Sequence, residues 1–207
     1  MAGKTENIFS DEHLDILKEI GSMGTAHAAT ALSKLTGKKV TMPVPNVSWL
    51  DFQNVANFFG GPENIIVGIL VSLSGNIQGM MMHLMELTSA HNIAKLIIDT
   101  PVPEDSLQFG EMERSVIEEV GNIMISSYLG SLAGLTSSQI KPSIPYMCVD
   151  MANAILSVPA TDFGRMADKM LFIESRISVE NVDCNGCFVL VPNLHSFYRI
   201  LRALGVE

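Results

Sequence analysis

The chain has 207 residues, enough to bury a sizeable core in one domain of two similar halves or in two small domains. Its 13 basic and 22 acidic residues give a net charge of −9 without any basic run, so we expect neither nucleic-acid binding nor anchoring at a membrane surface. The apolar runs are too short to span a bilayer, the N-terminus resembles no signal peptide, and three cysteines do not suit a secreted disulfide framework. We therefore expect a cytoplasmic protein.

The first half of the sequence predicts a long helix followed by strands. Ser10 and the two acidic residues after it are typical of a helix start, and Gly37 marks the end of the apolar stripe that follows. Gly75-Asn76 is a turn signal between two apolar runs. The predicted elements are a helix over 10–35, a strand over 40–50, a short helix over 52–59, a hairpin of 65–73 with 77–84, and a helix capped by Thr88-Ser89 that ends near residue 98.

The second half predicts the same order of elements after a turn-rich connection at residues 99–105. Asn185-Gly186 is a strong two-residue turn signal. The predicted elements are a long helix over 110–135, a strand over 139–147, a short helix over 150–156, a hairpin of 170–179 with 187–191, and a last helix that opens at Leu194. Pooling the strands of both halves gives an α+β fold, in which an antiparallel-rich sheet has the two long helices packed on one face.

The two halves repeat one pattern without a gap. Shifting the first segment by 100 residues aligns identical residues and conservative pairs such as Val44 and Ile144. A repeat of this length indicates two copies of one supersecondary unit. We therefore expect a single domain over residues 1–207, built as a pseudo-two-fold repeat of units at about 9–100 and 106–205. The identical pairs are Glu19/Glu119, Gly21/Gly121, Leu32/Leu132, Leu35/Leu135, Thr36/Thr136 and Pro45/Pro145.

Polar residues stand out on the second long helix. Glu119 and Asn122 are three residues apart, and Ser115 lies one turn before Glu119, so all three share one helix face. A solvated surface explains a single Glu well, but a mid-helix Asn lowers helix propensity and points to function. The amide can hold a water by donating and accepting at once, and the carboxylate can pair with a cation on a partner. Hydrolysis of a phosphoryl group gains chiefly from such positioning.

The spacing of these residues forms a doubled motif that runs to a proline in each half. The copies read Asp15-x3-Glu19-x2-Ser22-x22-Pro45 and Ser115-x3-Glu119-x2-Asn122-x22-Pro145. This motif, with flanking stretches such as residues 27–32 and 149–152, resembles the CheC family of chemotaxis phosphatases, which is related to CheX and FliY. The resemblance covers essentially the whole chain.

The resemblance implies that the protein dephosphorylates CheY, a response regulator that carries an aspartyl phosphate. Glu119 would pair with the active-site Lys of CheY, and Asn122 would orient the attacking water. The Mg²⁺ belongs to the regulator, so we expect no cofactor and no metal ligands in this chain. Four further motif residues would support the two sites: Asp15, Ser115, Pro45 and Pro145.

The first copy departs from the family pattern at Ser22, where a shorter hydroxyl replaces the amide. Glu19 remains for docking, so we expect a second, weakened site here and the main catalytic site at Glu119 and Asn122. An alternative is a non-catalytic docking module that regulates CheY or CheD by binding. A flagellar-switch component is a third, less favoured alternative, because such a protein would carry an N-terminal docking peptide or an added C-terminal domain.

The short helix predicted at residues 150–156 begins with one carboxylate, Asp150. A helix of this kind can simply cap the sheet. In the CheC family the corresponding region contacts CheD, a receptor-modifying deamidase, so the resemblance makes Asp150 a candidate contact for CheD.

Other reactive side chains receive structural interpretations. Cys184 and Cys187 form a CxxC that invites zinc or redox chemistry, but no second CxxC completes a tetrahedral site. We interpret the two as cross-strand neighbours beside the predicted turn, and we place Cys148 and the Met80–Met82 run in the core. The five histidines show no metal-ligand spacing, and no Gly-rich phosphate loop is present.

Overall fold

A computed structural model describes residues 10–98, 106–163, 169–180 and 182–205 of the chain. The connection expected at residues 99–105 lies outside these ranges. In chain order the elements are α1 (Asp11–Thr36), β1 (Val40–Thr41), β2 (Val47–Asp51), α2 (Phe52–Phe58), β3 (Ile65–Gly75), β4 (Gly79–Glu86), α3 (Leu87–Ile97), α4 (Glu111–Thr136), β5 (Ile140–Pro142), β6 (Tyr146–Met151), α5 (Ala152–Phe163), β7 (Lys169–Val179), β8 (Val182–Pro192) and α6 (Leu194–Ala203).

The described strands form one eight-stranded sheet in which every pairing is antiparallel. The hairpin β3–β4 pairs with the hairpin β7–β8 through β4 and β8 at the centre. Both short strands β1 and β2 pair with β7 at one edge, and β5 and β6 pair with β3 at the other. The predicted α+β fold with an antiparallel sheet is therefore confirmed.

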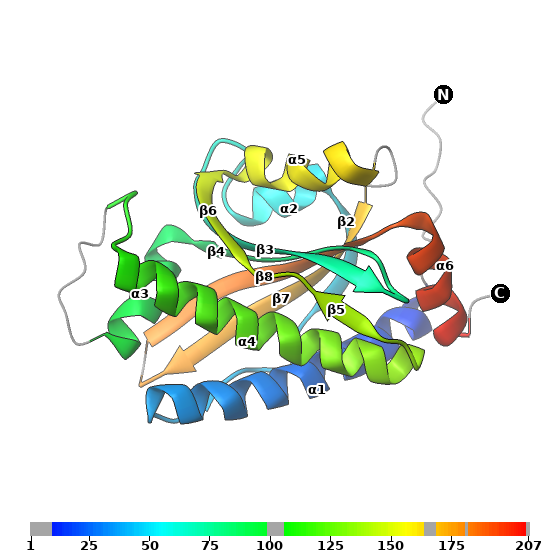
Figure 1. The fold of residues 1–207 in the computed structure, drawn as a ribbon, viewed down its shortest axis with the longest axis horizontal. Helices are drawn as coiled ribbons and strands as arrows, with labels where there is room; N and C mark the ends of the chain where they lie inside the picture. Colours follow the sequence, from blue (N-terminus) through cyan, green and yellow to red (C-terminus); the bar gives the residue numbers. More distant parts are fainter. Residues whose placement is uncertain (1–9, 99–105, 164–168, 181, 206–207) are drawn as a thin grey trace.

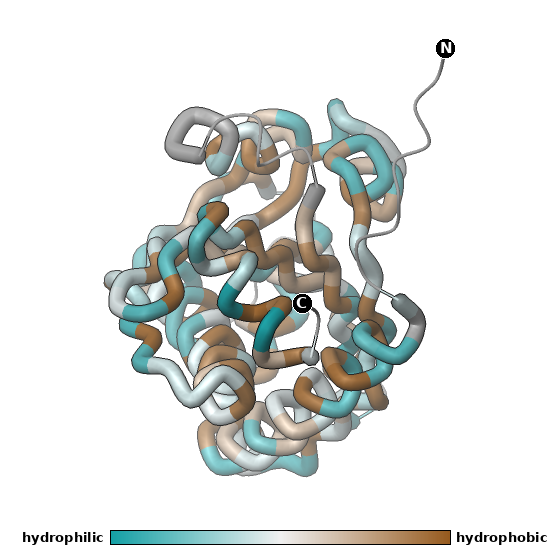
Figure 2. The backbone as a smooth tube through the Cα atoms, turned by 90° about the vertical axis from the view of Figure 1, so that its right-hand side faces the viewer, coloured by the Kyte–Doolittle hydropathy of each residue, from teal (hydrophilic) through white to brown (hydrophobic). Residues whose placement is uncertain are grey.

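Helices cover both faces of the sheet (Figure 1). The long helices α1 and α4 lie side by side on one face, as predicted, whereas α2 and α5 cover the other. Each face has its own buried cluster of hydrophobic side chains, and the Met80–Met82 run belongs to them as predicted. The hydrophobic strands run through the middle of the molecule in Figure 2. Within the described ranges, no helix has both the length and the apolar character needed to cross a bilayer.

Local capping fixes the ends of the long helices. Ser10 Oγ accepts a hydrogen bond from the backbone N–H of His13, and Gly37 ends α1 with a φ of 66°. In α4 the Glu113 carboxylate accepts from the Gly110 N–H at 2.7 Å. These signals are local in the sequence, and the predicted bounds of both helices hold to within two residues.

Each strand predicted directly after a long helix is divided in two. The interruption covers residues 42–46 in the first half and 143–145 in the second, and each contains the motif proline. Proline has no N–H to donate to a neighbouring strand, so the ladder breaks there. The motif prolines Pro45 and Pro145 therefore stand in irregular segments between strands.

The turn predicted at Asn185-Gly186 is wrong. These residues lie within β8, and the chain reverses after Glu180, which has a φ of 48°. Gly186 serves another purpose, because a Cβ there would lie 2.5 Å from the Leu84 carbonyl oxygen on the neighbouring strand. The glycine thus permits a close approach of two strands, which the turn statistics of Asn-Gly do not consider.

Two helix starts also differ from the prediction. Glu86, rather than Thr88-Ser89, precedes α3, and Ser89 is buried with its Oγ accepting from the Asn185 N–H at 2.9 Å. The short helix predicted from Asp150 begins at Ala152 instead and continues to Phe163. In both cases a contact or pairing with a distant strand, absent from local sequence patterns, decides the boundary.

Candidate functional site

The second copy of the motif lies on the solvent side of α4. Glu119 is exposed, Asn122 is half-buried, and Ser115 is exposed one turn earlier. Within the part of the chain that the structure describes, no residue pairs with the Glu119 carboxylate or hydrogen-bonds the Asn122 amide. The carboxylate and both ends of the amide are therefore open to an incoming molecule.

The opposite side of the same turn fixes α4 on the sheet. A Cβ at Gly121 would lie 2.7 Å from Cγ1 of Ile69 on β3, so the glycine lets the helix backbone come close to the strand. Its neighbours Val120 and Met124 are fully buried. This packing holds the turn rigidly and directs Glu119 and Asn122 away from the sheet.

The first copy has the same placement but different hydrogen bonding. Glu19 and Asp15 are exposed on α1, and Ser22 is half-buried like its counterpart Asn122. The Ser22 hydroxyl donates to the Lys18 carbonyl oxygen at 2.8 Å. Its proton is thus engaged by the helix backbone, so Ser22 offers a ligand only an oxygen acceptor.

The motif prolines sit differently in the two copies. Pro45 is buried, and its ring covers Gly21, where a Cβ would lie 2.9 Å from Pro45 Cγ. Pro145 is half-buried and follows Ile144, which is 89% exposed. Sequence reasoning paired Val44 with Ile144 but did not identify both as exposed; an apolar residue before each motif proline was the available signal.

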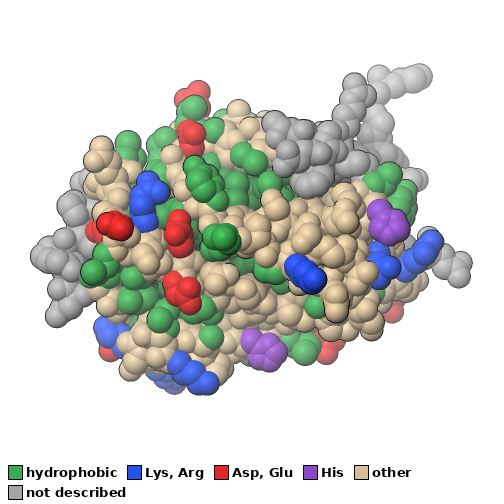
Figure 3. Space-filling model, in the orientation of Figure 1, with side chains coloured by type: hydrophobic (Ala, Val, Ile, Leu, Met, Phe, Trp, Pro, Cys, Tyr) green, Lys and Arg blue, Asp and Glu red, His purple; other side chains and the backbone are tan. Residues whose placement is uncertain are grey.

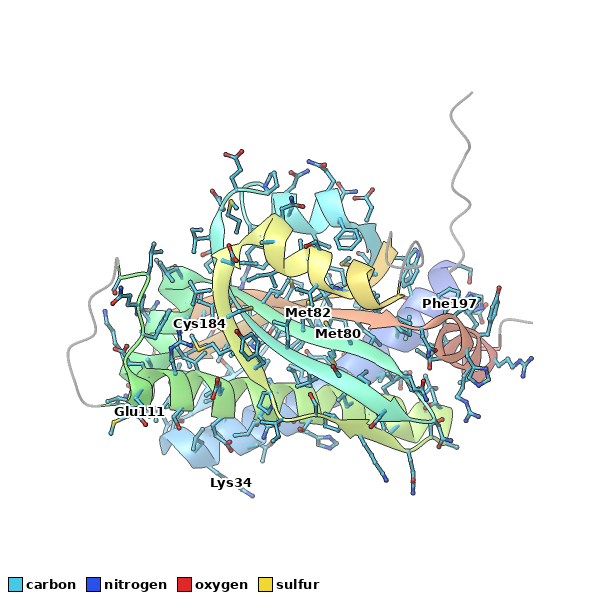
Figure 4. All side chains as sticks on the ribbon, turned by 45° about the horizontal axis from the view of Figure 1, so that its top comes forward. Lys34, Met80, Met82, Glu111, Cys184 and Phe197 are labelled. Atoms are coloured by element: carbon cyan, nitrogen blue, oxygen red, sulfur yellow. The ribbon has the colours of Figure 1, made fainter. Side chains whose placement is uncertain are left out.

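The two copies lie apart because α1 and α4 run in opposite directions (Figure 1). Figure 4 shows Lys34, near the end of α1, and Glu111, at the start of α4, at the same end of the molecule. The helices meet where the Thr25 hydroxyl and the Tyr128 hydroxyl lie 2.7 Å apart. With a rise of 1.5 Å per residue from this point, Ser22 and Asn122 are separated by about 13 Å along the helix axes, and Glu19 and Glu119 by about 22 Å.

Tyr128 is a positioning residue that the sequence analysis did not single out. Burial raises the pKa of its hydroxyl, which stays protonated and bonded to Thr25. Gly24 packs directly on the tyrosine, with a hypothetical Cβ 3.1 Å from its ring. Glycines three residues apart on α1, Gly21 and Gly24, were the sequence signal for this close helix contact.

The sequence has relatives among known proteins. Residues 12–48 match the model of the CheC-like family. The CheY-P phosphatase CheC of Bacillus subtilis (strain 168) is 30% identical over 205 residues, which cover 97% of this chain and 98% of that protein. The chain belongs to the CheC-like family. The flagellar motor switch phosphatase FliY of the same organism is 29% identical over 136 residues, covering 66% of this chain and 35% of FliY.

The fold also resembles that of a solved structure. The crystal structure of Thermotoga maritima FliY has a TM-score of 0.75 and 20% sequence identity, and the match covers 95% of this chain and 98% of that one. This chain and Thermotoga maritima FliY therefore share a fold.

Asp150 lies in β6 and not on a helix, contrary to the prediction. It is exposed, and its Oδ1 accepts from the Met151 N–H at 2.7 Å. Met151 pairs with Ile65 across the sheet, and the two side chains are 44% and 37% exposed. Asp150 thus lies at a sheet edge beside exposed apolar side chains. Acidic and hydrophobic side chains are interspersed on the left of the face seen in Figure 3.

The cysteines of the CxxC are neighbours on one strand, so their predicted cross-strand placement beside a turn is wrong. Cys184 and Cys187 lie in β8 and belong to the hydrophobic clusters on opposite faces of the sheet. Burial raises the pKa of Cys184 to about 12 and that of Cys187 well above its usual value. Cys148, expected in the core, is half-buried, with a pKa raised to about 11 by burial. All three thiols stay protonated at neutral pH and are poor nucleophiles.

Across the described ranges, no three His, Cys, Asp or Glu side chains gather closely enough to hold a metal ion.

Proposed function

We propose that this chain hydrolyses the aspartyl phosphate of phosphorylated CheY, with Glu119 and Asn122 as its catalytic residues. The single observation that carries the assignment is the Asn122 amide, which has no partner among the described residues and stands one turn from the equally unpaired Glu119. Membership of the CheC-like family, with a CheY-P phosphatase as a full-length relative, supports the substrate.

In the proposed reaction the Asn122 side chain holds a water that donates a hydrogen bond to the amide oxygen, with the NH₂ group free to donate. The water oxygen attacks the phosphorus, the bond between phosphorus and the aspartyl oxygen breaks, and inorganic phosphate leaves while the carboxylate is restored. Glu119 pairs with the Lys of the regulator and fixes the two proteins in register. Positioning of this kind contributes on the order of 10²-fold or more to the rate.

The chain is proposed to supply no cofactor of its own. The regulator brings the Mg²⁺ that neutralises charge on the transferred phosphoryl group, and this protein adds the positioned water. Ser115 and Pro145 would support the second-copy site, and Asp15 and Pro45 would support the first, weakened one.

We further propose that the two halves form one domain with a pseudo-two-fold repeat and that the protein acts in the cytoplasm. The order helix, two short strands, helix, hairpin, helix occurs twice along the chain, and strands of both halves share one sheet. Both observations support a duplicated unit.

The decisive experiment follows the decay of phosphorylated CheY in the presence of catalytic amounts of this protein. We expect many turnovers per molecule, at a rate well above the regulator's own dephosphorylation. Tight binding without faster decay would instead identify a docking module that acts by occupancy. If the chain neither accelerates the decay nor binds CheY, then CheY is not its partner.

CheD is the proposed second partner, and Asp150 at the sheet edge is its proposed contact. The support is the family resemblance together with the exposed carboxylate beside Met151 and Ile65. Asp150→Lys should abolish CheD capture in a pull-down and leave hydrolysis of phosphorylated CheY unchanged. Glu12→Lys, an equal charge change at an exposed position of α1, serves as the control. Undiminished capture by Asp150→Lys would remove this residue from the interface.

A further inference from the structure

The distance between the two motif copies is small compared with the contact area of a docked protein. Ser22 and Asn122 are about 13 Å apart along the helix axes, and the two glutamates about 22 Å. Adjacent helices add a lateral offset of only 8–10 Å. A Cβ at Gly24 would lie 3.1 Å from Tyr128, so the glycine allows α1 and α4 to lie at the close end of that range.

Both copies open on the same side of the molecule. The helices α1 and α4 cover one face of the sheet, and Glu19 and Glu119 are exposed on their solvent sides. A Cβ at Gly24 would lie 3.1 Å from the Tyr128 Cα, so these two residues are level. The opposite helix directions then place Ser22 level with Gly130 of α4 and Asn122 level with Thr30 of α1. Both Gly130 and Thr30 are exposed. A protein seated over either copy therefore also covers part of the other helix.

Small residues lie between the two copies. Ala26 and Ser126 are exposed midway between the two motif turns, and a Cβ at Gly130 would meet no atom within 4 Å. The larger side chains exposed on this stretch of α1 are Met23 and His27, which a protein docked on either copy would also meet.

A specific protein interface buries about 800 Å² on each partner, which corresponds to a disc about 32 Å across. A weak, transient contact of about 600 Å² per partner is still about 28 Å across. Both diameters exceed the separation of the two copies. Contact areas centred on the two copies must therefore overlap.

We infer that the two motif copies form one docking platform that holds a single response regulator at a time. This inference rests on the proposed function and adds a rule of occupancy to it. A regulator docked on the Glu19 copy excludes a second one from the Glu119 copy. The weakened copy is thus a competitor of the catalytic copy and not an independent second site.

Exclusive docking has a kinetic signature. Unproductive binding at the first copy lowers kcat and KM by the same factor and leaves kcat/KM unchanged. Removing the first copy with Glu19→Lys should therefore raise kcat and KM together, by up to about twofold if both copies bind equally well. Independent copies would give an unchanged or lowered kcat.

The test is a titration of the full-length chain with beryllofluoride-activated CheY, a stable mimic of the phosphorylated form, read by calorimetry and native mass spectrometry. We expect one CheY per chain at saturation for the parent, for Glu19→Lys and for Glu119→Lys, and no binding for the double variant. Glu63→Lys is the matched control, because Glu63 is exposed in the connection between β3 and α2, a helix that packs on the face of the sheet opposite α1 and α4.

Two results would overturn the inference while leaving the phosphatase intact. Two CheY molecules bound per chain would show that the contact areas do not overlap. Complete loss of binding in Glu119→Lys alone would show that the first copy does not dock and so cannot compete. Absence of binding by the parent chain would instead contradict the proposed function itself.

Discussion

The two motif turns, residues 19–22 and 119–122, occupy matching places on α1 and α4 yet differ in what their side chains can offer. In the first turn the Ser22 hydroxyl donates its hydrogen bond to the Lys18 carbonyl oxygen. In the second, the Asn122 amide has no partner among the described residues. A shared backbone and an exposed glutamate therefore do not make two equal sites. Whether the second polar group is left unsatisfied decides which copy can hold a water.

The packing behind the two turns differs as well. Gly121 is pressed against Ile69 of the sheet, whereas Gly21 is covered by the ring of Pro45. In the first copy the motif proline fills space beside the helix, and in the second the sheet does so and leaves Pro145 half-buried. The same motif thus packs against a proline ring in the first copy and against the sheet in the second.

The largest expected effect separates the two copies by activity. Asn122→Ala should lower the turnover of phosphorylated CheY by on the order of 10²-fold, because the water loses its positioning group. Ser22→Ala should change the total rate little, since its hydroxyl proton is already engaged. Regulator decay under catalytic conditions measures both. A greater loss in the serine variant would assign the chemistry to the first copy.

The hairpins at the centre of the sheet give a second comparison. His83 of β4 and Phe188 of β8 face each other across the strand pair and stack with ring centroids 4.6 Å apart. Burial lowers the pKa of His83 to about 3, from 6.5. The unfolded chain therefore takes up a proton below pH 6.5 that the folded chain refuses, so stability is complete above pH 6.5 and falls as the pH drops towards 3.

Between pH 7 and pH 5 this difference should cost about 2 kcal/mol of unfolding free energy. Denaturant unfolding at several pH values measures how steeply the unfolding free energy depends on pH. In His83→Leu this slope should decrease by the amount that one proton contributes. An unchanged slope in His83→Leu would show that another group governs acid sensitivity. The residue paired with His83 on the second hairpin, Phe188, has no titratable group.

The third comparison concerns the paired glycines. At Gly121 a Cβ would meet three atoms of the buried Ile69 side chain at 2.7–3.0 Å, while at Gly21 it would meet one ring atom of Pro45 at 2.9 Å. Overpacking a core typically costs 1–3 kcal/mol, and replacing glycine in a helix by alanine returns up to about 1 kcal/mol. Gly121→Ala should thus lower stability by about 1 kcal/mol and Gly21→Ala by less. Thermal or denaturant unfolding measures both losses of stability. Equal losses would show that Ile69 and Pro45 move aside for the added methyl group equally easily.

Features fixed by neighbours in the sequence could be predicted, and features fixed by distant strands could not. The start at Ser10 and the end at Gly37 follow from local capping, and the residues of the doubled motif follow from their spacing. Gly186 was misread because its need for a small residue arises from Leu84 on another strand. Asp150 was placed on a helix because pairing with β3, which extends the strand to Met151, leaves no local mark.

The engaged hydroxyl of Ser22 was also beyond the sequence, since a serine in a helix can point either to solvent or to its own backbone. The sequence indicated that the first copy was weaker because serine is shorter than asparagine. The structure adds a second reason, the hydrogen bond to Lys18. This reason leads to a test in which activity of the first copy is restored.

The smallest expected effect, and the most specific, is restoration of the first copy by Ser22→Asn. The longer amide cannot repeat the short hydroxyl bond to Lys18, and exposed Gly130 lies level with it on α4 and leaves room. Thr25 and His27 stand where the second copy has Ile125 and Ser127. Thr25 is buried against Tyr128 and stays out of a docked partner's way, whereas His27 is exposed. In the parent background the rate should rise less than about twofold, because a single regulator occupies the platform at a time. In the Asn122→Ala background the same change should restore activity severalfold, measured by regulator decay, with Ser22→Ala in that background as the control. If Ser22→Asn restores nothing while the double variant still binds CheY, the support beneath the first turn, and not its missing amide, limits that copy.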